Sequence, residues 1–127
     1  MEAAAIVLAA GAGTRMKSKK PKVAHEILGK PLVRWVVDAV RDAGVQRVVS
    51  VVGHGRDQVI PLVEGDSAIV VQEEQNGTAH AVAVCKDALD GFDGSLAVVS
   101  GDCPLITADT LARLIEARER NDAAVVV

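Results

Sequence analysis

The sequence predicts an α/β fold, a Rossmann-like three-layer α/β/α sandwich with a mainly parallel sheet, and three observations support this prediction. Short apolar runs of strand length recur along the chain, at residues 3–10, 47–52, 68–71, 95–100 and 123–127. Segments with helical spacing of apolar residues separate these runs. The runs are apolar throughout rather than alternating, which is typical of strands in a parallel sheet that is covered on both faces.

The first half of the chain gives the elements in a clear order. The strand at 3–10 ends at Gly11, and residues 11–22, rich in Gly, Ser, Lys and Pro, form a loop. Pro31 suits the first turn of a helix, whose apolar residues follow at helical spacing until Gly44 ends it. After the strand at 47–52, residues 56–63 form a short helix that Pro61 distorts.

The second half continues the alternation. The strand at 68–71 leads into a polar loop at 72–77 and then into a helix at 78–89. After the strand at 95–100, Thr107 caps a helix whose buried face carries Leu111, Leu114 and Ile115. The run at 123–127 begins a fifth strand. Because a protein seldom stops inside an apolar strand, we expect these residues to be a piece of a longer gene product.

Composition excludes several classes of protein. Half of the 127 residues are hydrophobic and 24% are charged, which excludes a disordered chain. The apolar runs are far shorter than the roughly 20 residues that span a bilayer, so no membrane segment is expected. Aromatic residues make up only 2% of the chain, which argues against a nucleic-acid binder that stacks bases on aromatic rings.

The charges are distributed unevenly. Residues 11–22 hold five of the 14 basic residues and no acidic one, so the rest of the chain carries 9 basic and 17 acidic residues. A short basic segment on an otherwise acidic chain favours a small, highly charged anion as ligand, because a long polyanion would be repelled by the rest of the chain.

The cysteines and histidines give no sign of a zinc or nucleophile site. Cys85 and Cys103 form no CxxC pair and the three histidines are isolated, which argues against zinc and predicts the reducing cytoplasm. Cys103 has no nearby base or cation in the sequence, which argues against a role as nucleophile. Cys85 is expected on the buried face of a helix. His80 is expected to be a surface or packed histidine rather than a catalyst.

The loop after the first strand has the composition of a phosphate site. Residues 8–15 read LAAGAGTR, and their small side chains allow backbone N–H groups to approach an anion. The Arg15 guanidinium can donate two hydrogen bonds to phosphate oxygens, and the Lys22 ammonium adds a compact positive charge. The alternative is a solvated basic loop that binds nothing. Met16 replaces the third glycine of GxGxxG, and GxxxxGK[ST] is absent, which argues against a nicotinamide site and a P-loop.

The loop at 72–77 is suited to reading a nucleobase. Gln72, Gln75 and Asn76 carry amides, whose donors and acceptors can match the edge of a pyrimidine. Gly77 permits close approach, and Thr78 starts a helix whose N-terminus points into the site. An ordinary polar loop with a helix cap explains the same residues.

A single carboxylate follows the fourth strand. Asp102, preceded by Gly101, could hold Mg²⁺ beside bound phosphates, because magnesium often takes only one or two protein carboxylates. The alternative is an Asx-type turn before Pro104.

Four motifs together resemble those of the sugar-phosphate nucleotidyltransferases. They are LAAGAGTRM at 8–16, PKV at 21–23 with GKPL at 29–32, QNGTAHAV at 75–82 and SGDCPL at 100–105. In combination they are similar to the uridylyltransferase domain of the bacterial bifunctional N-acetylglucosamine-1-phosphate uridylyltransferase/glucosamine-1-phosphate acetyltransferases. The resemblance implies a nucleotide-diphospho-sugar transferase fold that is incomplete. Residues 1–127 would be the N-terminal nucleotide-binding part, without the rest of that domain or any acetyltransferase domain.

The resemblance also implies roles for single residues. The backbone cradle for the nucleotide is matched by Leu8, Ala9, Ala10 and Gly11. The catalytic cations on the triphosphate and the transferred phosphate are matched by Arg15 and Lys22. The uracil and ribose contacts are matched by Gln72, Gly77 and Thr78. The next nucleotide-contacting segment is matched by Ser100, Gly101 and Asp102, with Asp102 as the magnesium ligand. Two positions depart from the usual pattern, Ala79 for glycine and Ser100 for tyrosine.

The implied reaction transfers a uridylyl group from UTP to N-acetylglucosamine-1-phosphate, with Mg²⁺ as cofactor, and gives UDP-N-acetylglucosamine and pyrophosphate for peptidoglycan synthesis. The expected partners are UTP and the sugar-1-phosphate, and the resemblance implies a homotrimer for the full-length protein. Two alternatives stay open. One is a nucleotidyltransferase for another sugar or alcohol phosphate. The other is a non-catalytic nucleotide-binding module, since these residues alone are expected to show little or no turnover.

Overall fold

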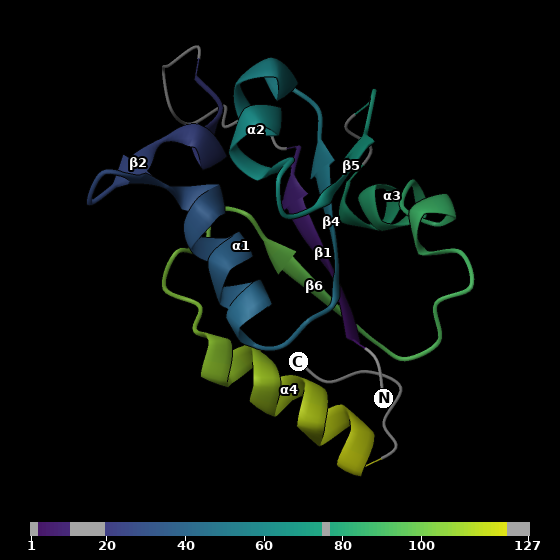
Figure 1. Cartoon of the computed structure of the whole chain (residues 1–127). Helices are drawn as coiled ribbons and strands as arrows, with labels where there is room; N and C mark the ends of the chain where they lie inside the picture. Colours follow the sequence, from purple (N-terminus) through teal and green to yellow (C-terminus); the bar gives the residue numbers. More distant parts are fainter. Residues whose placement is uncertain (1–2, 11–19, 75–76, 122–127) are drawn as a thin grey trace.

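The computed structural model describes residues 3–10, 20–74 and 77–121. Its centre is a sheet of four strands, namely β1 (Ala3–Ala9), β4 (Arg47–Val52), β5 (Ala68–Val71) and β6 (Ser95–Ser100). The spatial order is β5-β4-β1-β6, and every pair is parallel (Figure 1). The expected parallel sheet is therefore confirmed, and the expected strand at 123–127 lies outside the described residues.

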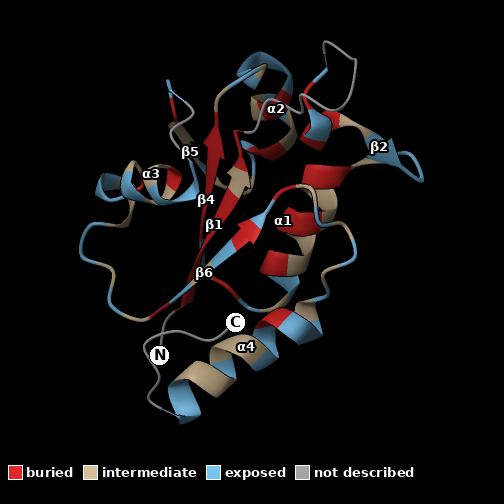
Figure 2. Ribbon diagram, turned by 180° about the vertical axis from the view of Figure 1, so that it is seen from behind, coloured by how far each residue is buried: buried red, intermediate tan, exposed pale blue. Residues whose placement is uncertain are grey.

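The sheet is covered on both faces, as a three-layer sandwich requires. Helices α1 (Leu32–Asp42), α2 (Arg56–Val63) and α4 (Ala108–Arg120) cover one face, and α3 (Thr78–Ala83) with the short 3₁₀ helix η2 (Asp87–Leu89) covers the other. Side chains of β1 alternate between the two layers, with Ala5 and Val7 in one core and Ile6 in the other. Figure 2 shows the central strands buried between these layers.

Several local expectations are confirmed. The Thr107 hydroxyl oxygen accepts a hydrogen bond from the Thr110 backbone N–H at 3.1 Å and caps α4, and Leu111 is buried below it. Gly44 follows α1 with a φ of +90°, the left-handed conformation that ends helices. Helix α2 has the expected bounds and continues through Pro61.

The sequence did not predict the hairpin that precedes α1. A 3₁₀ turn, η1 (Lys22–Ala24), leads into the antiparallel strands β2 (Glu26–Ile27) and β3 (Lys30–Pro31), so α1 begins at Leu32, after Pro31. The Trp35 indole N–H from α1 lies 3.1 Å from the backbone oxygens of both Ile27 and Lys30. The hairpin is therefore fixed by a contact with the following helix, which its own residue pattern does not encode.

The expected continuous helix at 78–89 is wrong. Helix α3 ends at Ala83, a turn follows, and η2 forms separately. Backbone bonds over three residues, from Cys85 N–H to Val82 O and from Lys86 N–H to Ala83 O, tighten the chain after α3. Cys85 is nevertheless fully buried in the core on this face, as expected.

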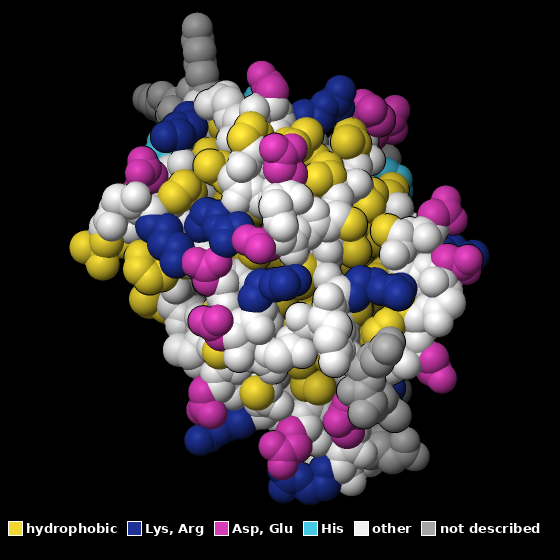
Figure 3. All heavy atoms as spheres, viewed as in Figure 1, with side chains coloured by type: hydrophobic (Ala, Val, Ile, Leu, Met, Phe, Trp, Pro, Cys, Tyr) yellow, Lys and Arg dark blue, Asp and Glu magenta, His cyan; other side chains and the backbone are white. Residues whose placement is uncertain are grey.

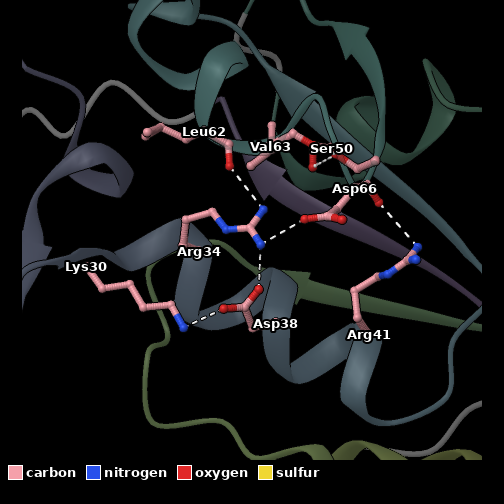
Figure 4. A network of polar contacts seen from close by, with 9 residues as sticks. Lys30, Arg34, Asp38, Arg41, Ser50, Leu62, Val63 and Asp66 are labelled. Atoms are coloured by element: carbon pink, nitrogen blue, oxygen red, sulfur yellow. Dashed lines mark hydrogen bonds and ion pairs between the residues drawn. The ribbon is translucent and has the colours of Figure 1, made fainter.

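A network of ion pairs joins α1 to its neighbours (Figure 4). The Asp38 carboxylate pairs with the Lys30 ammonium of β3 and with the Arg34 guanidinium, the latter at 2.5 Å. Arg34 also pairs with Asp66 at 2.8 Å and donates to the Leu62 carbonyl at 3.1 Å. The network therefore ties the hairpin, α1 and the end of α2 together.

The surface carries charges of both signs. On the face shown in Figure 3, basic and acidic side chains are interspersed rather than gathered into one basic patch. Among the helices formed by the described residues, none has the length and apolar character needed to cross a membrane.

Candidate active site

The strand order places a crevice at the carboxyl ends of the strands. From β1 the chain crosses to β4 and β5 on one side, and later returns to β6 on the other side of β1. In parallel α/β sheets, ligands bind at such a change of direction. A cavity of about 340 Å³ lies there, lined by Leu8, Ala10, Gln72, Gly77, Thr78, Ala81 and Ser100. The ends of β1 and β6, the loop after β5 and the start of α3 all contribute.

A larger hollow lies elsewhere. About 640 Å³ opens between β6 and α4, lined mainly by apolar side chains such as Leu96, Val98, Ile106 and Leu114. Of the predicted site residues, only Ser100 is among the described residues that line this hollow, whereas several of them line the smaller cavity. The smaller cavity is therefore the candidate active site.

Two glycines bring the backbone segments of this site into contact. A Cβ built on Gly101 would lie 2.9 Å from the Leu8 carbonyl oxygen, and the Gly101 N–H donates to that same oxygen at 2.8 Å. A Cβ built on Gly53 would lie 3.0 Å from the Gln72 carbonyl oxygen and 3.2 Å from the Ala10 Cβ. Only glycine permits this approach without a displacement of the neighbouring backbone. The end of β1 therefore contacts both the loop after β5 and the segment after β6.

The predicted cradle after β1 is described in part. Leu8 and Ala10 line the cavity, whereas the Ala9 side chain is buried in the core on the opposite face of the sheet. The Ala9 side chain is therefore not available to a ligand in the cavity. Gly11 and Arg15 lie outside the described residues.

The base-reading segment is described at three of its predicted residues. Gln72 is 4% exposed, and its Nε2 lies 2.9 Å from His80 Nδ1 and 3.4 Å from the Gly77 carbonyl oxygen. Gly77 has a φ of +94° and precedes Thr78, the first residue of α3. Gln75 and Asn76 lie outside the described residues.

Lys22 and Asp102 form an ion pair beside the cavity. The Lys22 Nζ lies 2.9 Å from Asp102 Oδ2, and the side chains are 47% and 30% exposed. The Ser100 hydroxyl donates to Asp102 Oδ1. The hydrogen bond from Ser100, followed by the one from Lys22, holds the pKa of the Asp102 carboxyl below its ordinary value, against the effect of burial. Asp102 is therefore a carboxylate at neutral pH.

The position of Lys22 follows from the packing of its neighbours. Pro21 packs against Gly55, where a Cβ would lie 2.3 Å from Pro21 Cγ, and Val23 packs against Gly101, where a Cβ would lie 3.2 Å from Val23 Cγ1. The turn that carries Lys22 is thus held between two glycine contacts. These contacts place the lysine at the carboxyl end of β6.

The residues around Asp102 fit a metal carried by a nucleotide better than one held by protein alone. Within the described ranges, no three His, Cys, Asp or Glu side chains come together as a metal site. Mg²⁺ commonly takes one or two carboxylates and completes its shell with water and phosphate oxygens. Asp102, as a partly exposed carboxylate, suits that role.

Sequence reasoning missed three contributors to the site. Ala81 lines the cavity one helical turn after Thr78, a spacing from which it could have been found. His80 contacts Gln72, and Gly53 admits the Gln72 backbone, but both contacts join segments whose proximity the sequence does not reveal.

Fold and cavity together define a doubly wound α/β domain with its candidate ligand crevice at the carboxyl ends of the strands. The MobA-like NTP transferase domain family matches residues 5–127, and the chain belongs to this family.

Curated relatives agree with the expected resemblance. The bifunctional protein GlmU of Pelotomaculum thermopropionicum is 50% identical over 114 residues, which are 90% of this chain and 25% of that protein. Five further relatives, 44–48% identical, carry the same name. The similarity to the N-terminal, uridylyltransferase part of this bifunctional family is therefore confirmed. The chain spans only 25–28% of the length of these relatives.

Solved structures share the fold. A nucleotidyl transferase from Methanothermobacter thermautotroptrophicus superposes with a TM-score of 0.76 at 26% identity, over 91% of this chain and 57% of that one. HddC from Yersinia pseudotuberculosis, solved with GMP-PN, superposes with a TM-score of 0.74 at 26% identity, over 91% of this chain and 53% of that one.

Proposed function

We propose that this chain is the N-terminal, nucleotide-binding part of a nucleotidyltransferase domain that transfers a uridylyl group from UTP to N-acetylglucosamine-1-phosphate. The observation that carries the proposal is the cavity at the carboxyl ends of the strands, which joins the cradle after β1, the amide loop and Ser100. The relatives named GlmU support the same class of substrates.

The nucleotide would lie across the ends of β1 and β6. Leu8 and Ala10 offer a surface of small or apolar groups, and the start of α3 contributes Gly77 and Thr78. The Gln72 carboxamide, buried at the edge of the cavity, is the group suited to a pyrimidine edge.

The triphosphate would lie toward Lys22. In the structure the Lys22 ammonium is neutralised by Asp102, and both side chains are partly exposed. A triphosphate offers Lys22 a more highly charged partner, so the ammonium is positioned to turn from Asp102 to phosphate oxygens. Arg15 is proposed as a second cation on the same phosphates.

Asp102 and the phosphates are the groups that would hold Mg²⁺. When bound, the ion would stabilise negative charge on the phosphates in the transition state. We propose Mg²⁺ because the site offers a hard oxygen ligand.

The reaction needs no protein nucleophile. A phosphate oxygen of the sugar-1-phosphate attacks the α-phosphorus of UTP, the bond between the α-phosphorus and its bridging oxygen breaks, and pyrophosphate leaves with the electron pair. The described residues would therefore act by holding the nucleotide in place and offsetting charge.

A turnover assay with the protein as its gene encodes it tests the proposal. With N-acetylglucosamine-1-phosphate and MgCl₂, UTP is expected to be used far better than CTP, GTP or dTTP. Preference for another nucleotide, or for another sugar or alcohol phosphate, would refute the assignment of substrates and favour the related transferase.

For the 127 residues alone, a second function is favoured by the small share of the relatives that they cover. They would bind the nucleotide without turnover, because residues for the sugar phosphate would lie in the part of the domain that they do not include. Rapid release of pyrophosphate by these residues alone would contradict this.

A further inference from the structure

Gln72 and His80 form a polar pair behind the cavity. Gln72 follows β5, His80 lies on α3, and Gln72 Nε2 is 2.9 Å from His80 Nδ1. Gln72 lines the cavity, whereas His80 is not among the described residues that do. Among the described residues, the Gln72 carboxamide is therefore the group that connects His80 to the cavity.

The orientation of the carboxamide is fixed by a third group. A carboxamide could face an imidazole nitrogen with either its NH₂ or its oxygen, because the ring nitrogen is a donor in one tautomer and an acceptor in the other. The Gly77 carbonyl oxygen lies 3.4 Å from the same amide atom as the ring does. Since a carbonyl only accepts hydrogen bonds, the group between Gly77 and His80 is the NH₂.

This orientation assigns the tautomer of His80. With the Gln72 NH₂ directed at it, Nδ1 must be the acceptor, so the neutral ring carries its proton on Nε2. Both hydrogens of the Gln72 NH₂ are then directed at acceptors of the protein, one at Nδ1 of His80 and one at the Gly77 carbonyl. The end of the carboxamide that remains for a ligand is the oxygen, Oε1.

We propose that His80 is a positioning residue that locks the Gln72 carboxamide with its oxygen toward the nucleobase, so that the site selects a base with an N–H at N3. The proposal rests on the proposed function, since it supposes that a pyrimidine nucleotide enters this cavity. Uracil carries a hydrogen on N3, whereas N3 of cytosine is an acceptor that would face the Gln72 oxygen without a proton between them. A buried acceptor left without a donor is costly, so cytosine is disfavoured.

The first experiment needs no variant. In the protein as its gene encodes it, labelled with ¹⁵N-histidine, NMR shifts of the ring nitrogens report the tautomer of His80 at neutral pH. A proton on Nε2 and an unprotonated Nδ1 are expected. A proton on Nδ1 would overturn the proposal, because the Gln72 carboxamide would then face the cavity with its NH₂.

The second experiment measures base selection by calorimetry with MgCl₂. In His80→Leu the lock is lost and the Gln72 carboxamide is free to turn, so the ratio of UTP to CTP affinity is expected to fall about tenfold, or about 1.4 kcal/mol. In His80→Asn the side-chain oxygen takes the place of Nδ1 on the same γ-carbon, so the ratio is expected to stay within about threefold of the parent.

A matched control lies on the same helix. Ala83 ends α3 and is exposed, so Ala83→Leu introduces the same side chain without replacing a partner of Gln72, and the ratio is expected to stay at the parent value. An unchanged ratio in a folded His80→Leu would overturn the positioning role while leaving the proposed function intact. A parent protein that does not bind UTP with MgCl₂ would instead overturn the proposed function, and this inference with it.

Discussion

The Lys22 ammonium lies 2.9 Å from the Asp102 carboxylate, although the two residues are far apart in the sequence. Lys22 is held there by Pro21 on Gly55 and by Val23 on Gly101. The pair brings the two groups proposed for phosphate and metal to one point at the carboxyl end of β6. Each neutralises the other in the structure.

If Lys22 and Asp102 act on the same phosphates and metal, removal of either side chain is expected to lower the activity. Lys22→Ala and Asp102→Ala, made in the protein as its gene encodes it, are each expected to lower kcat/KM for UTP by at least about 100-fold, the scale of a single electrostatic donor in a transition state. Steady-state pyrophosphate release measures this. Asp109→Ala, which removes an exposed carboxylate paired with Arg113 at 3.0 Å, serves as the control and is expected to keep parent activity. Parent rates in both site variants would refute the roles.

Gly101 is predicted to be a structural requirement of the site. In Gly101→Ala the new methyl group meets the Leu8 carbonyl oxygen at 2.9 Å and Val23 at 3.2 Å, so the free energy of unfolding is expected to fall by about 1–3 kcal/mol. Urea denaturation measures the change. Gly65→Ala is the control, because a Cβ there meets no atom within 4 Å and its φ is not positive. Equal stability of the two variants would show that the contact at Gly101 is not tight.

The ion pairs of Asp38 predict a dependence of stability on pH. Burial alone would raise the pKa of this carboxyl, but the hydrogen bond from Lys30 and the charge of Arg34 hold it below its ordinary value. A lowered folded-state pKa adds stability above the unfolded pKa of about 3.9, and this contribution is lost as pH falls through the folded pKa.

Asp38→Asn is therefore expected to be less stable than the parent at neutral pH by about 1 kcal/mol or less, since the pairs are partly exposed. The difference should shrink as the pH falls below the ordinary pKa of an aspartate and disappear once the pH lies below the lowered folded-state pKa of Asp38. Thermal or urea unfolding of both proteins across this range checks it, with Asp109→Asn as the control for an exposed pair. A difference that persists at low pH would assign the effect to packing rather than charge.

Much of the fold could be predicted because it depends on local patterns. The apolar runs predicted all four strands of the central sheet, with β1 one residue shorter than expected. Thr107 correctly predicted the start of α4, and Gly44 the end of α1. The hairpin at residues 26–31 could not be predicted, because Trp35 of α1 fixes it through contacts with Ile27 and Lys30. The break after Ala83 was missed because the apolar pattern continues through it.

The candidate site was predictable as segments and not as contacts. The rule that ligands lie at strand ends selected the segments that line the cavity. It did not reveal that Gln72 would be held by His80, because that bond joins a loop to a helix across the cavity wall. Nor did it reveal that Ala9 faces the core, which depends on the register of β1 in the sheet.

The most direct measurement of the central claim is an NMR titration of backbone amides with UTP and MgCl₂. The account predicts that shifts gather at the cavity and the segment beside it, at Leu8, Ala10, Gln72, Gly77, Thr78, Ala81, Ser100 and Gly101. Amides at the opposite end of the sheet, near Gly44 and Gln46, should stay unchanged. Shifts that avoid the cavity, or none at saturating nucleotide, would contradict it.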